Sequence, residues 1–371
     1  MRLLERKTIY RDGEYVAFPN VAWLDETTLA CFFRHARERQ KEWGNYTHID
    51  PSAKDVYILS RDGGKTFGTE LHTVLDDDQS EQDPCVTVLR DGRILVSCFR
   101  WQLVPEGRGA EIWGEELYRI YGRTRKGLWD SYNIGFHINI SDDRGKTWRQ
   151  GPVIMPEGYV PGSAVRGNIL ELPAGILLLP FYGCKKAGDL ASCGVLKSSD
   201  RGETWEFCSE MACDPQKNFL EPNLFRTASG RIFGLIRTQS DFKKPGVNFE
   251  DTYLNLHIAL SEDDGKTFAP AREIPSVLGS NCFHALQLRS GRVFLHYGYR
   301  HTPFGIRAKI CDGELSDIEK APEFIVCDDA PNGDLGYSHA VQLPDDSVLL
   351  VYYISGQDGI RKIEGAVIKE E

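Results

Sequence analysis

The alternation of apolar and polar positions is clearest between Glu221 and Arg237. Residues Asn223–Arg226 and Ile232–Ile236 are typical of two short strands, and the Thr-Ala-Ser-Gly-Arg segment between them is typical of a tight turn, because Gly reaches backbone angles that a strand residue cannot. An antiparallel hairpin returns the chain to its start, so we expect Glu221 and Arg237 to lie side by side at the open end. A carboxylate and a guanidinium held on rigid strands favour a site over a surface ion pair.

The same pattern of two apolar strands around a turn recurs along the chain. Each copy has polar or aromatic residues at its open end, and the offset between first and last residue is nearly constant. The six predicted hairpins lie at residues 19–34, 83–100, 166–182, 221–237, 284–300 and 337–353. Self-similarity over a long period is typical of solenoids and propellers.

A second motif, Ser-x-Asp-x-Gly-x-Thr followed by Trp or Phe, alternates with the hairpins. It occurs four times, at residues 60–67, 141–148, 198–205 and 261–268. The pattern predicts a turn between two outer strands. The Asp carboxylate accepts backbone N–H groups within the turn, Gly takes the left-handed position and the aromatic ring packs beneath. Its spacing suits no metal site.

These motifs are Asp boxes, and through them nearly the whole chain resembles the sialidase (neuraminidase) superfamily. The resemblance implies an all-β fold, a six-bladed β-propeller of four-stranded antiparallel blades in one domain covering residues 1–371. It also implies that the Asp boxes are structural and remote from the catalytic centre. The fifth blade has a worn box near residues 307–318, and we expect the strand at Lys7–Tyr10 to complete the last blade and close the ring.

The longest departure from the repeat is an inserted loop at residues 101–132, rich in Trp and Tyr that alternate with charged residues. Because it leaves from the open end of a hairpin, we expect it to overhang the pocket, where aromatic faces can stack on sugar rings. A packed lid or an oligomer contact is the alternative.

Charge and cysteine usage limit the partners and the compartment. The net charge of −10 argues against nucleic acid as the main partner. The N-terminus lacks the apolar core of a signal peptide, and no apolar run is long enough to span a bilayer. Ten cysteines without a Cys-x-x-Cys pair predict reduced thiols in a cytoplasmic protein, unless a leader has been removed. No cofactor motif is present.

In a propeller the open ends of all inner hairpins converge on one face, where five arginines predict a pocket for a carboxylate or sulfate group of a carbohydrate. The predicted substrate-binding residues are Arg34, Asp83, Arg100, Arg166, Arg237, His284, Arg300 and Arg307.

The resemblance also implies catalytic residues. Sialidases attack the anomeric carbon with a tyrosine whose proton a glutamate draws. Tyr337 opens the last hairpin and Glu221 opens the fourth, as that pattern requires. The first blade departs from it, because Phe18 stands where the family has the arginine of Arg-Ile-Pro, and Arg34 stands where the acid/base aspartate belongs. The predicted substitutes for the acid/base group are His35, His48 and Asp50.

The pattern therefore predicts an exo-acting glycoside hydrolase of the sialidase-like type, which cleaves a terminal anionic sugar with Tyr337 and Glu221. One alternative is a glycosidase or polysaccharide lyase that uses histidine and tyrosine chemistry on a glycan without sialic acid. A lyase would form an unsaturated product with new absorbance. Another is a non-catalytic glycan-binding propeller, which would bind without turnover. The sugar, the linkage and the oligomeric state stay open.

Overall fold

The predicted hairpins form the inner strands of six antiparallel sheets in the computed structural model, which describes residues 1–43, 49–75, 80–244 and 246–371. Each sheet is one blade of a β-propeller. Blade 1 contains β2 (Tyr15–Trp23), β3 (Leu29–Ala36), β4 (Lys54–Ser60) and β5 (His72–Thr73). Blade 2 contains β6 (Ser80–Val88), β7 (Ile94–Pro105), β9 (Trp129–Ser141) and β10 (Arg149–Ile154), with β8 (Arg123–Arg125) paired to β9. Blade 3 contains β11 (Leu170–Glu171), β12 (Leu177–Gly183), β13 (Ser192–Ser198) and β14 (Glu206–Ala212).

The other three blades continue this order around the ring. Blade 4 contains β15 (Lys217–Arg226), β16 (Ile232–Ser240), β17 (Asn255–Ser261) and β18 (Arg272–Leu278). Blade 5 contains β19 (Phe283–Gln287), β20 (Val293–Tyr299), β21 (Gly305–Cys311) and β22 (Glu323–Cys327). Blade 6 contains β23 (Gly336–Gln342), β24 (Val348–Ser355), β25 (Arg361–Lys369) and β1 (Arg2–Tyr10).

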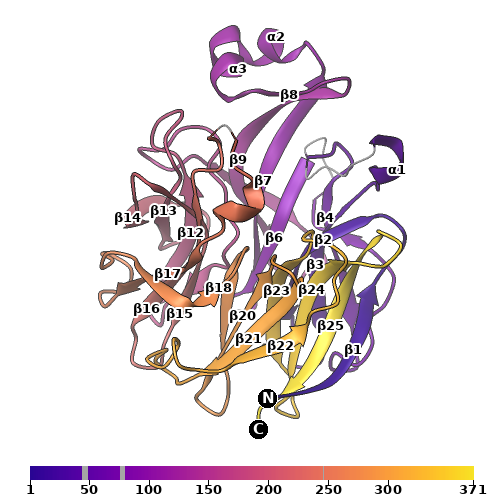
Figure 1. The fold of residues 1–371 in the computed structure, drawn as a ribbon, viewed down its shortest axis with the longest axis vertical. Coiled ribbons are helices and arrows are strands. Elements are labelled where there is room, and N and C mark those ends of the chain that lie inside the picture. The colour runs from indigo at the N-terminus through magenta and orange to yellow at the C-terminus, as the bar shows by residue number, and fades with distance from the viewer. Residues whose placement is uncertain (44–48, 76–79, 245) are drawn as a thin grey trace.

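The N-terminal strand closes the ring, as the sequence predicted. β1 pairs antiparallel with β25 from Arg2 opposite Lys369 to Tyr10 opposite Ile363. The two chain ends therefore lie next to each other, as Figure 1 shows at the bottom of the molecule. This pairing covers the edge that β25 would otherwise expose.

Hydrophobic clusters fill the space between neighbouring blades. One cluster joins β2 and β3 to β23 and β24 through residues such as Phe33 and Val351, and five further clusters occupy the other interfaces. Because each sheet is buried on both faces, its central strands are apolar almost throughout, which explains the continuous apolar runs in the sequence.

All four Asp boxes lie between the third and fourth strands of their blades, away from the inner strands. In the box of blade 4, Asp263 Oδ1 accepts the backbone N–H of Thr267 at 2.9 Å, and Asp263 Oδ2 accepts the Thr267 hydroxyl at 2.7 Å. The worn box of blade 5 keeps the same link between Asp312 and Ser316. The structural interpretation of the boxes therefore agrees with their contacts.

Residues 101–132, predicted as an inserted loop, form an extension of blade 2 that contains its own helices and a short strand. β7 continues to Pro105, and α2 (Gly109–Trp113) and α3 (Glu115–Tyr121) follow before β8 and β9 return the chain. Figure 1 shows this extension standing beyond the body of the propeller at the top. Its order comes from Asp130, whose carboxylate accepts the backbone N–H groups of Gly107 and Gly109 at 2.9 Å and the Tyr118 hydroxyl at 2.7 Å.

Short helices, the cysteines and the membrane question remain. Two short helices, α1 (Gln40–Trp43) and η1 (Phe249–Thr252), lie in connections between strands. All ten cysteines are free thiols, as expected, and most of them are buried. Within the described part of the chain, no helix has the length and apolarity needed to cross a bilayer.

The Asp boxes predict a pH-dependent contribution to stability. Hydrogen bonds from Thr267 lower the pKa of Asp263 from its usual 3.8 to about 2. A carboxylate whose pKa is lower in the folded state stabilises the fold above its unfolded pKa, and this contribution disappears as the pH falls toward 2. We expect Asp263→Ala to lower the Tm at pH 7, and the difference from wild type to shrink between pH 4 and pH 2 in thermal unfolding scans. A difference that stays constant over this range, or an equal loss in the loop variant Glu157→Ala, would contradict this role.

Candidate active site

Four inner strands each contain, within their first five residues, a residue in the left-handed backbone conformation. The φ angles are 58° for Phe18, 58° for Asp83, 46° for Glu221 and 48° for Tyr337. A shift in strand register accompanies each of them, as in a β-bulge. Bulky residues rarely adopt this conformation, and bulges commonly redirect a side chain near a functional site. Four equivalent positions around the ring thus share one unusual geometry.

The side chains of Tyr337, Glu221 and Arg237 form one hydrogen-bonded group at these open ends. The Tyr337 hydroxyl donates to Glu221 Oε1 at 2.7 Å. Arg237 Nη1 donates to the same carboxylate oxygen at 2.8 Å and lies 3.2 Å from the Tyr337 hydroxyl. All three residues are buried, with at most 7% of their surface exposed. The predicted proximity of Glu221 and Arg237 is therefore confirmed, and Tyr337 joins them from blade 6.

The protonation states within this group follow from its surroundings. Burial disfavours the charged carboxylate of Glu221, but the Arg237 guanidinium and the Tyr337 hydroxyl outweigh burial and lower its pKa. Burial and the Glu221 charge raise the pKa of Tyr337 well above its usual 10. The resting site therefore holds a neutral phenol that donates to an ionised carboxylate.

Sequence reasoning missed a residue that orients Arg237. Arg237 Nη2 donates to Gln239 Oε1 at 3.0 Å, and Gln239 Nε2 donates to the Thr252 hydroxyl at 3.0 Å. Gln239 lies two residues after Arg237 on β16, and this spacing places both on one face of the strand. This spacing was the signal in the sequence that could have identified Gln239 as a neighbour of Arg237.

Two more predicted arginines flank the Tyr337 ring. Arg166 Cζ lies 5.1 Å from the ring centroid, and Arg300 Cζ lies 5.5 Å from it. Arg300 Nη2 also donates to the Leu335 carbonyl at 3.0 Å. Cations over the ring stabilise negative charge that develops on the phenol oxygen.

Asp83 joins the site across Arg166, with Asp83 Oδ2 4.0 Å from Arg166 Nε. Burial raises the pKa of Asp83 to about 7, although Arg166 opposes this shift. A carboxyl group that holds a proton near neutral pH can donate a hydrogen bond as well as accept one.

The first blade contributes Phe18 and Arg34. The Phe18 ring packs edge-on against the Tyr337 ring, with 4.7 Å between centroids. Arg34 Cζ lies 6.0 Å from the Phe18 ring, and the guanidinium is fully buried. None of its three nitrogens has a hydrogen-bond partner among the residues that the structure describes. Arg34 therefore offers unused hydrogen-bond donors near Phe18.

His35 and Asp50, two of the residues predicted to act as acid or base, form their hydrogen bonds away from Tyr337 and Glu221. His35 follows Arg34 on β3 and faces the opposite side of the strand, where its Nε2 lies 2.7 Å from Asp12 Oδ2. Asp50 accepts Arg39 Nε at 3.0 Å. His48 lies outside the described residues.

Two predicted binding residues, Arg100 and Arg307, do not join the group around Tyr337. Their side chains form hydrogen bonds within their own blades instead. Arg100 Nη2 donates to Glu81 Oε1 at 3.1 Å. Arg307 donates to the Cys327 carbonyl at 2.7 Å on the outer strands of blade 5. The fifth-blade arginine at the site is thus Arg300.

His284 also lies elsewhere, because blade 5 lacks the bulge that is present in blades 1, 2, 4 and 6. β19 and β20 pair without a register shift, so Ser280 lies where His284 was expected, and Arg300 N donates to the Ser280 hydroxyl at 2.7 Å. His284 lies further along the channel, 5.1 Å from His339 between ring centroids. Both line a separate cavity of about 370 Å³ nearer the hairpin turns.

A cleft of about 450 Å³ adjoins the site between blade 3 and the extension of blade 2. Tyr182 and Gln82 line it on the side of the site, and Gln82 directly precedes Asp83. Burial raises the pKa of Tyr182, and the charges of Glu221 and Asp83 raise it further, so Tyr182 lies close to both carboxyl groups. Trp101 and Tyr121 of the extension line the opposite wall, in agreement with the expectation that the extension overhangs a pocket.

The fold is that of an Asp-box propeller. The family model described as BNR repeat-like domain matches residues 114–350, and the chain belongs to this family. A crystal structure of a protein of unknown function from Dyadobacter fermentans DSM 18053 is 30% identical, with a TM-score of 0.86 over 100% of this chain and 99% of that one.

Two sialidases share the fold at lower identity. The Hadza microbial sialidase Hz136 is 15% identical, with a TM-score of 0.63 over 95% of this chain and 65% of its own. The NanB sialidase from Streptococcus pneumoniae is 12% identical, with a TM-score of 0.69 over 98% of this chain and 70% of its own. No curated protein sequence matches the chain.

The buried ion pair predicts a large effect on stability. Arg237→Met leaves the Glu221 carboxylate buried without its cation, which we expect to reduce the free energy of unfolding by roughly 3–5 kcal/mol in urea titrations. Arg272→Met is the control, because Arg272 and Glu319 form an exposed pair at 2.8 Å and its loss should cost less than about 1 kcal/mol. The added change Glu221→Gln should recover part of the loss. Equal effects of the two arginine variants would contradict the importance of the buried pair.

Proposed function

We propose that the protein is an exo-acting glycoside hydrolase that cleaves a terminal anionic sugar through a tyrosine nucleophile. The observation that carries this proposal is the hydrogen bond of 2.7 Å from the Tyr337 hydroxyl to an ionised, buried Glu221. A phenol becomes a useful nucleophile when a nearby base accepts its proton as the new bond forms.

The reaction takes two steps in this scheme. In the first step, the Tyr337 oxygen bonds to the anomeric carbon, its proton passes to Glu221, and the bond to the leaving oxygen breaks. The leaving oxygen keeps the bonding electrons and takes a proton from water. In the second step, water bonds to the anomeric carbon and gives a proton to the hydroxide that the first step left. The bond to the tyrosine oxygen breaks, and this oxygen takes its proton back from Glu221. The product keeps the configuration of the substrate.

The arginines support an anionic sugar. Arg166, Arg237 and Arg300 surround the Tyr337 ring, whereas Glu221 and Asp83 are the carboxyl groups of this set. A substrate carboxylate would offset the excess positive charge and accept bidentate hydrogen bonds. Asp83 and Arg34 would then contact the sugar hydroxyls.

The location of the group supports exo action. Tyr337 and Glu221 lie at the end of the channel where the hairpins open, and both are almost fully shielded from solvent. The adjoining cleft offers space on one side of them. A terminal sugar would occupy the closed end, and the leaving group would lie in the cleft between Tyr182 and the extension.

The first catalytic prediction concerns the pair itself. We expect Tyr337→Phe and Glu221→Gln each to lower kcat/KM at least about 10²-fold on the aryl glycoside that wild type cleaves best. Tyr337→Phe removes the nucleophile, and Glu221→Gln removes the base. Tyr352→Phe is the matched control. Its hydroxyl bonds to Glu364 at 2.9 Å on the other face of β24, so its activity should match wild type.

A panel of acidic and neutral aryl glycosides, assayed by release of the phenol, provides the measurement. Full activity of Tyr337→Phe on any glycoside that wild type cleaves would refute the tyrosine nucleophile. Absence of turnover over the whole panel would favour a glycan-binding propeller instead.

The second catalytic prediction concerns sialosides. Phe18 replaces one arginine that would hold the sialic acid carboxylate, and Arg34 replaces the aspartate that would protonate the leaving group. Loss of a charged hydrogen-bond partner costs about 1.5–3 kcal/mol, and loss of the acid costs roughly 10²–10⁴-fold in rate. We therefore expect weak or no cleavage of a fluorogenic N-acetylneuraminic acid substrate. A turnover number on the order of 10 s⁻¹ would show that the first blade supports sialidase chemistry.

A further inference from the structure

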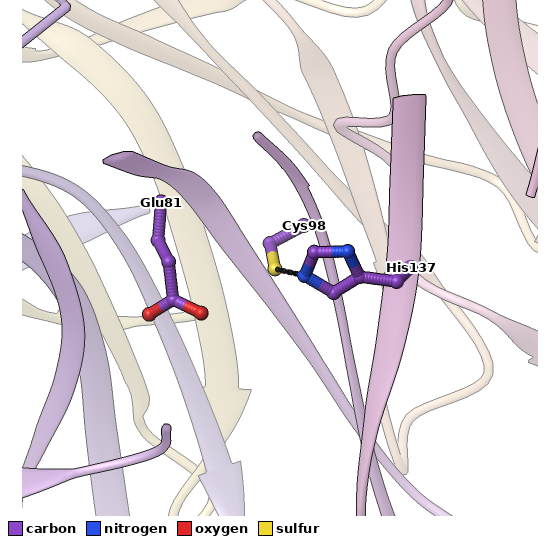
Figure 2. A group of neighbouring side chains, drawn as sticks. All are labelled: Glu81, Cys98 and His137. Atoms are coloured by element: carbon purple, nitrogen blue, oxygen red, sulfur yellow. Dashed lines mark hydrogen bonds between the residues drawn. The ribbon is translucent and has the colours of Figure 1, made fainter. Parts of the chain in front are cut away.

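A second group of chemically active side chains lies inside blade 2, apart from the Tyr337 site. Glu81 on β6, Cys98 on β7 and His137 on β9 converge from three neighbouring strands, as Figure 2 shows. One donor atom from each lies within 4.8 Å of the others. All three residues are buried, with exposed fractions of at most 1%. Thiolate, imidazole and carboxylate are the three ligand types that zinc binds in proteins.

The geometry of the pair formed by Cys98 and His137 agrees with a shared metal ion. Cys98 Sγ lies 3.2 Å from His137 Nε2. With bonds of about 2.3 Å to sulfur and about 2.0 Å to nitrogen, two ligands of a tetrahedral zinc ion lie about 3.5 Å apart. Small side-chain rotations would therefore admit the ion between these two atoms.

Asp55 provides an independent observation at the same place. Its carboxylate, on β4 of blade 1, is fully buried, and neither oxygen accepts a hydrogen bond from an N–H or O–H group of the described residues. Its backbone N–H donates to Glu81 Oε2 at 3.0 Å, and the thiol of Cys98, a weak donor, lies against the carboxyl group. A buried carboxylate without a strong donor is rare, and an ion or a water commonly completes such a site.

The surrounding charges also suit a dication. A thiolate with two carboxylates around Zn²⁺ leaves a single net negative charge, and Arg100 lies against it. Arg100 Nη2 donates to Glu81 Oε1 at 3.1 Å, which fixes the orientation of that carboxylate, as groups around metal ligands commonly do. Asn139 Nδ2 lies 3.7 Å from Cys98 Sγ and can donate to the metal-bound sulfur.

From this arrangement we propose that Glu81, Cys98 and His137 hold a structural zinc ion. Asp55 of blade 1 becomes the fourth ligand when its side chain rotates toward them, so the ion joins blades 1 and 2. On binding, the Cys98 thiol releases its proton to solvent, and bonds from sulfur and nitrogen to zinc replace the hydrogen bond between them. With Asp55 as the fourth ligand no coordination position stays open, so the ion stabilises the fold and takes no part in a reaction. The site does not depend on the function proposed above.

The test uses the full-length protein, produced with added ZnSO₄ and purified without chelator. Elemental analysis should find about one zinc ion per chain. Cobalt(II) exchanged for zinc should show thiolate-to-cobalt absorption. Cys98→Ser and His137→Gln should each retain at least tenfold less zinc than wild type. Cys193→Ser, which changes a fully buried thiol of blade 3, should retain zinc as wild type does.

The measurements on wild type test zinc binding even if a variant fails to fold. Chelator treatment should lower the wild-type Tm, and added Zn²⁺ should restore it. Wild-type protein that contains no stoichiometric metal and shows no cobalt–thiolate absorption would overturn the proposal, as would a folded Cys98→Ser variant that keeps its full zinc content.

Discussion

The pairing of β1 with β25 is the constraint on which the arrangement of the site depends. It supplies the fourth strand of blade 6 from the opposite end of the chain and leaves the ring without an open edge. Hydrophobic clusters between neighbouring blades then hold the six sheets in fixed angular positions. Because the ring is closed, Glu221 of blade 4 and Tyr337 of blade 6 meet within hydrogen-bond distance although 116 residues separate them.

Within this frame, local backbone strain sets the direction of the side chains at the candidate site. Four left-handed residues at bulges cost on the order of 1–3 kcal/mol each, and such strain persists where the surrounding structure enforces it. Burial of Glu221 adds a further cost, which Arg237 offsets. The stable fold thus holds Tyr337, Glu221 and Arg237 in an arrangement that a flexible loop would not maintain. Such fixed polar groups are typical of a preorganised site.

The sequence predicted those features that depend on short segments. The hairpins and Asp boxes are local patterns, and Glu221 lies beside Arg237 because one hairpin carries both. The position of Tyr337 followed from the family resemblance and the repeat. His284 was placed wrongly because the bulge that shifts the register is present in blades 1, 2, 4 and 6 but absent from blade 5.

Other features depend on side-chain direction or on long-range pairing. His35 neighbours Arg34 in the sequence yet faces the other side of β3, beside Asp12. The group of Glu81, Cys98 and His137 was not recognised, because the extension of blade 2 separates β7 from β9 in the sequence. Only the pairing of those strands brings the thiol and the imidazole together.

Mass spectrometry after reaction with fluorinated glycosyl fluorides, acidic and neutral, tests the tyrosine nucleophile most directly. Fluorine beside the anomeric centre slows the second step, so a covalent intermediate accumulates. We expect one sugar on the proteolytic peptide that contains Tyr337, and no label in Tyr337→Phe. A label on a carboxylate such as Glu221, or turnover with inverted configuration and no label, would contradict a tyrosine nucleophile.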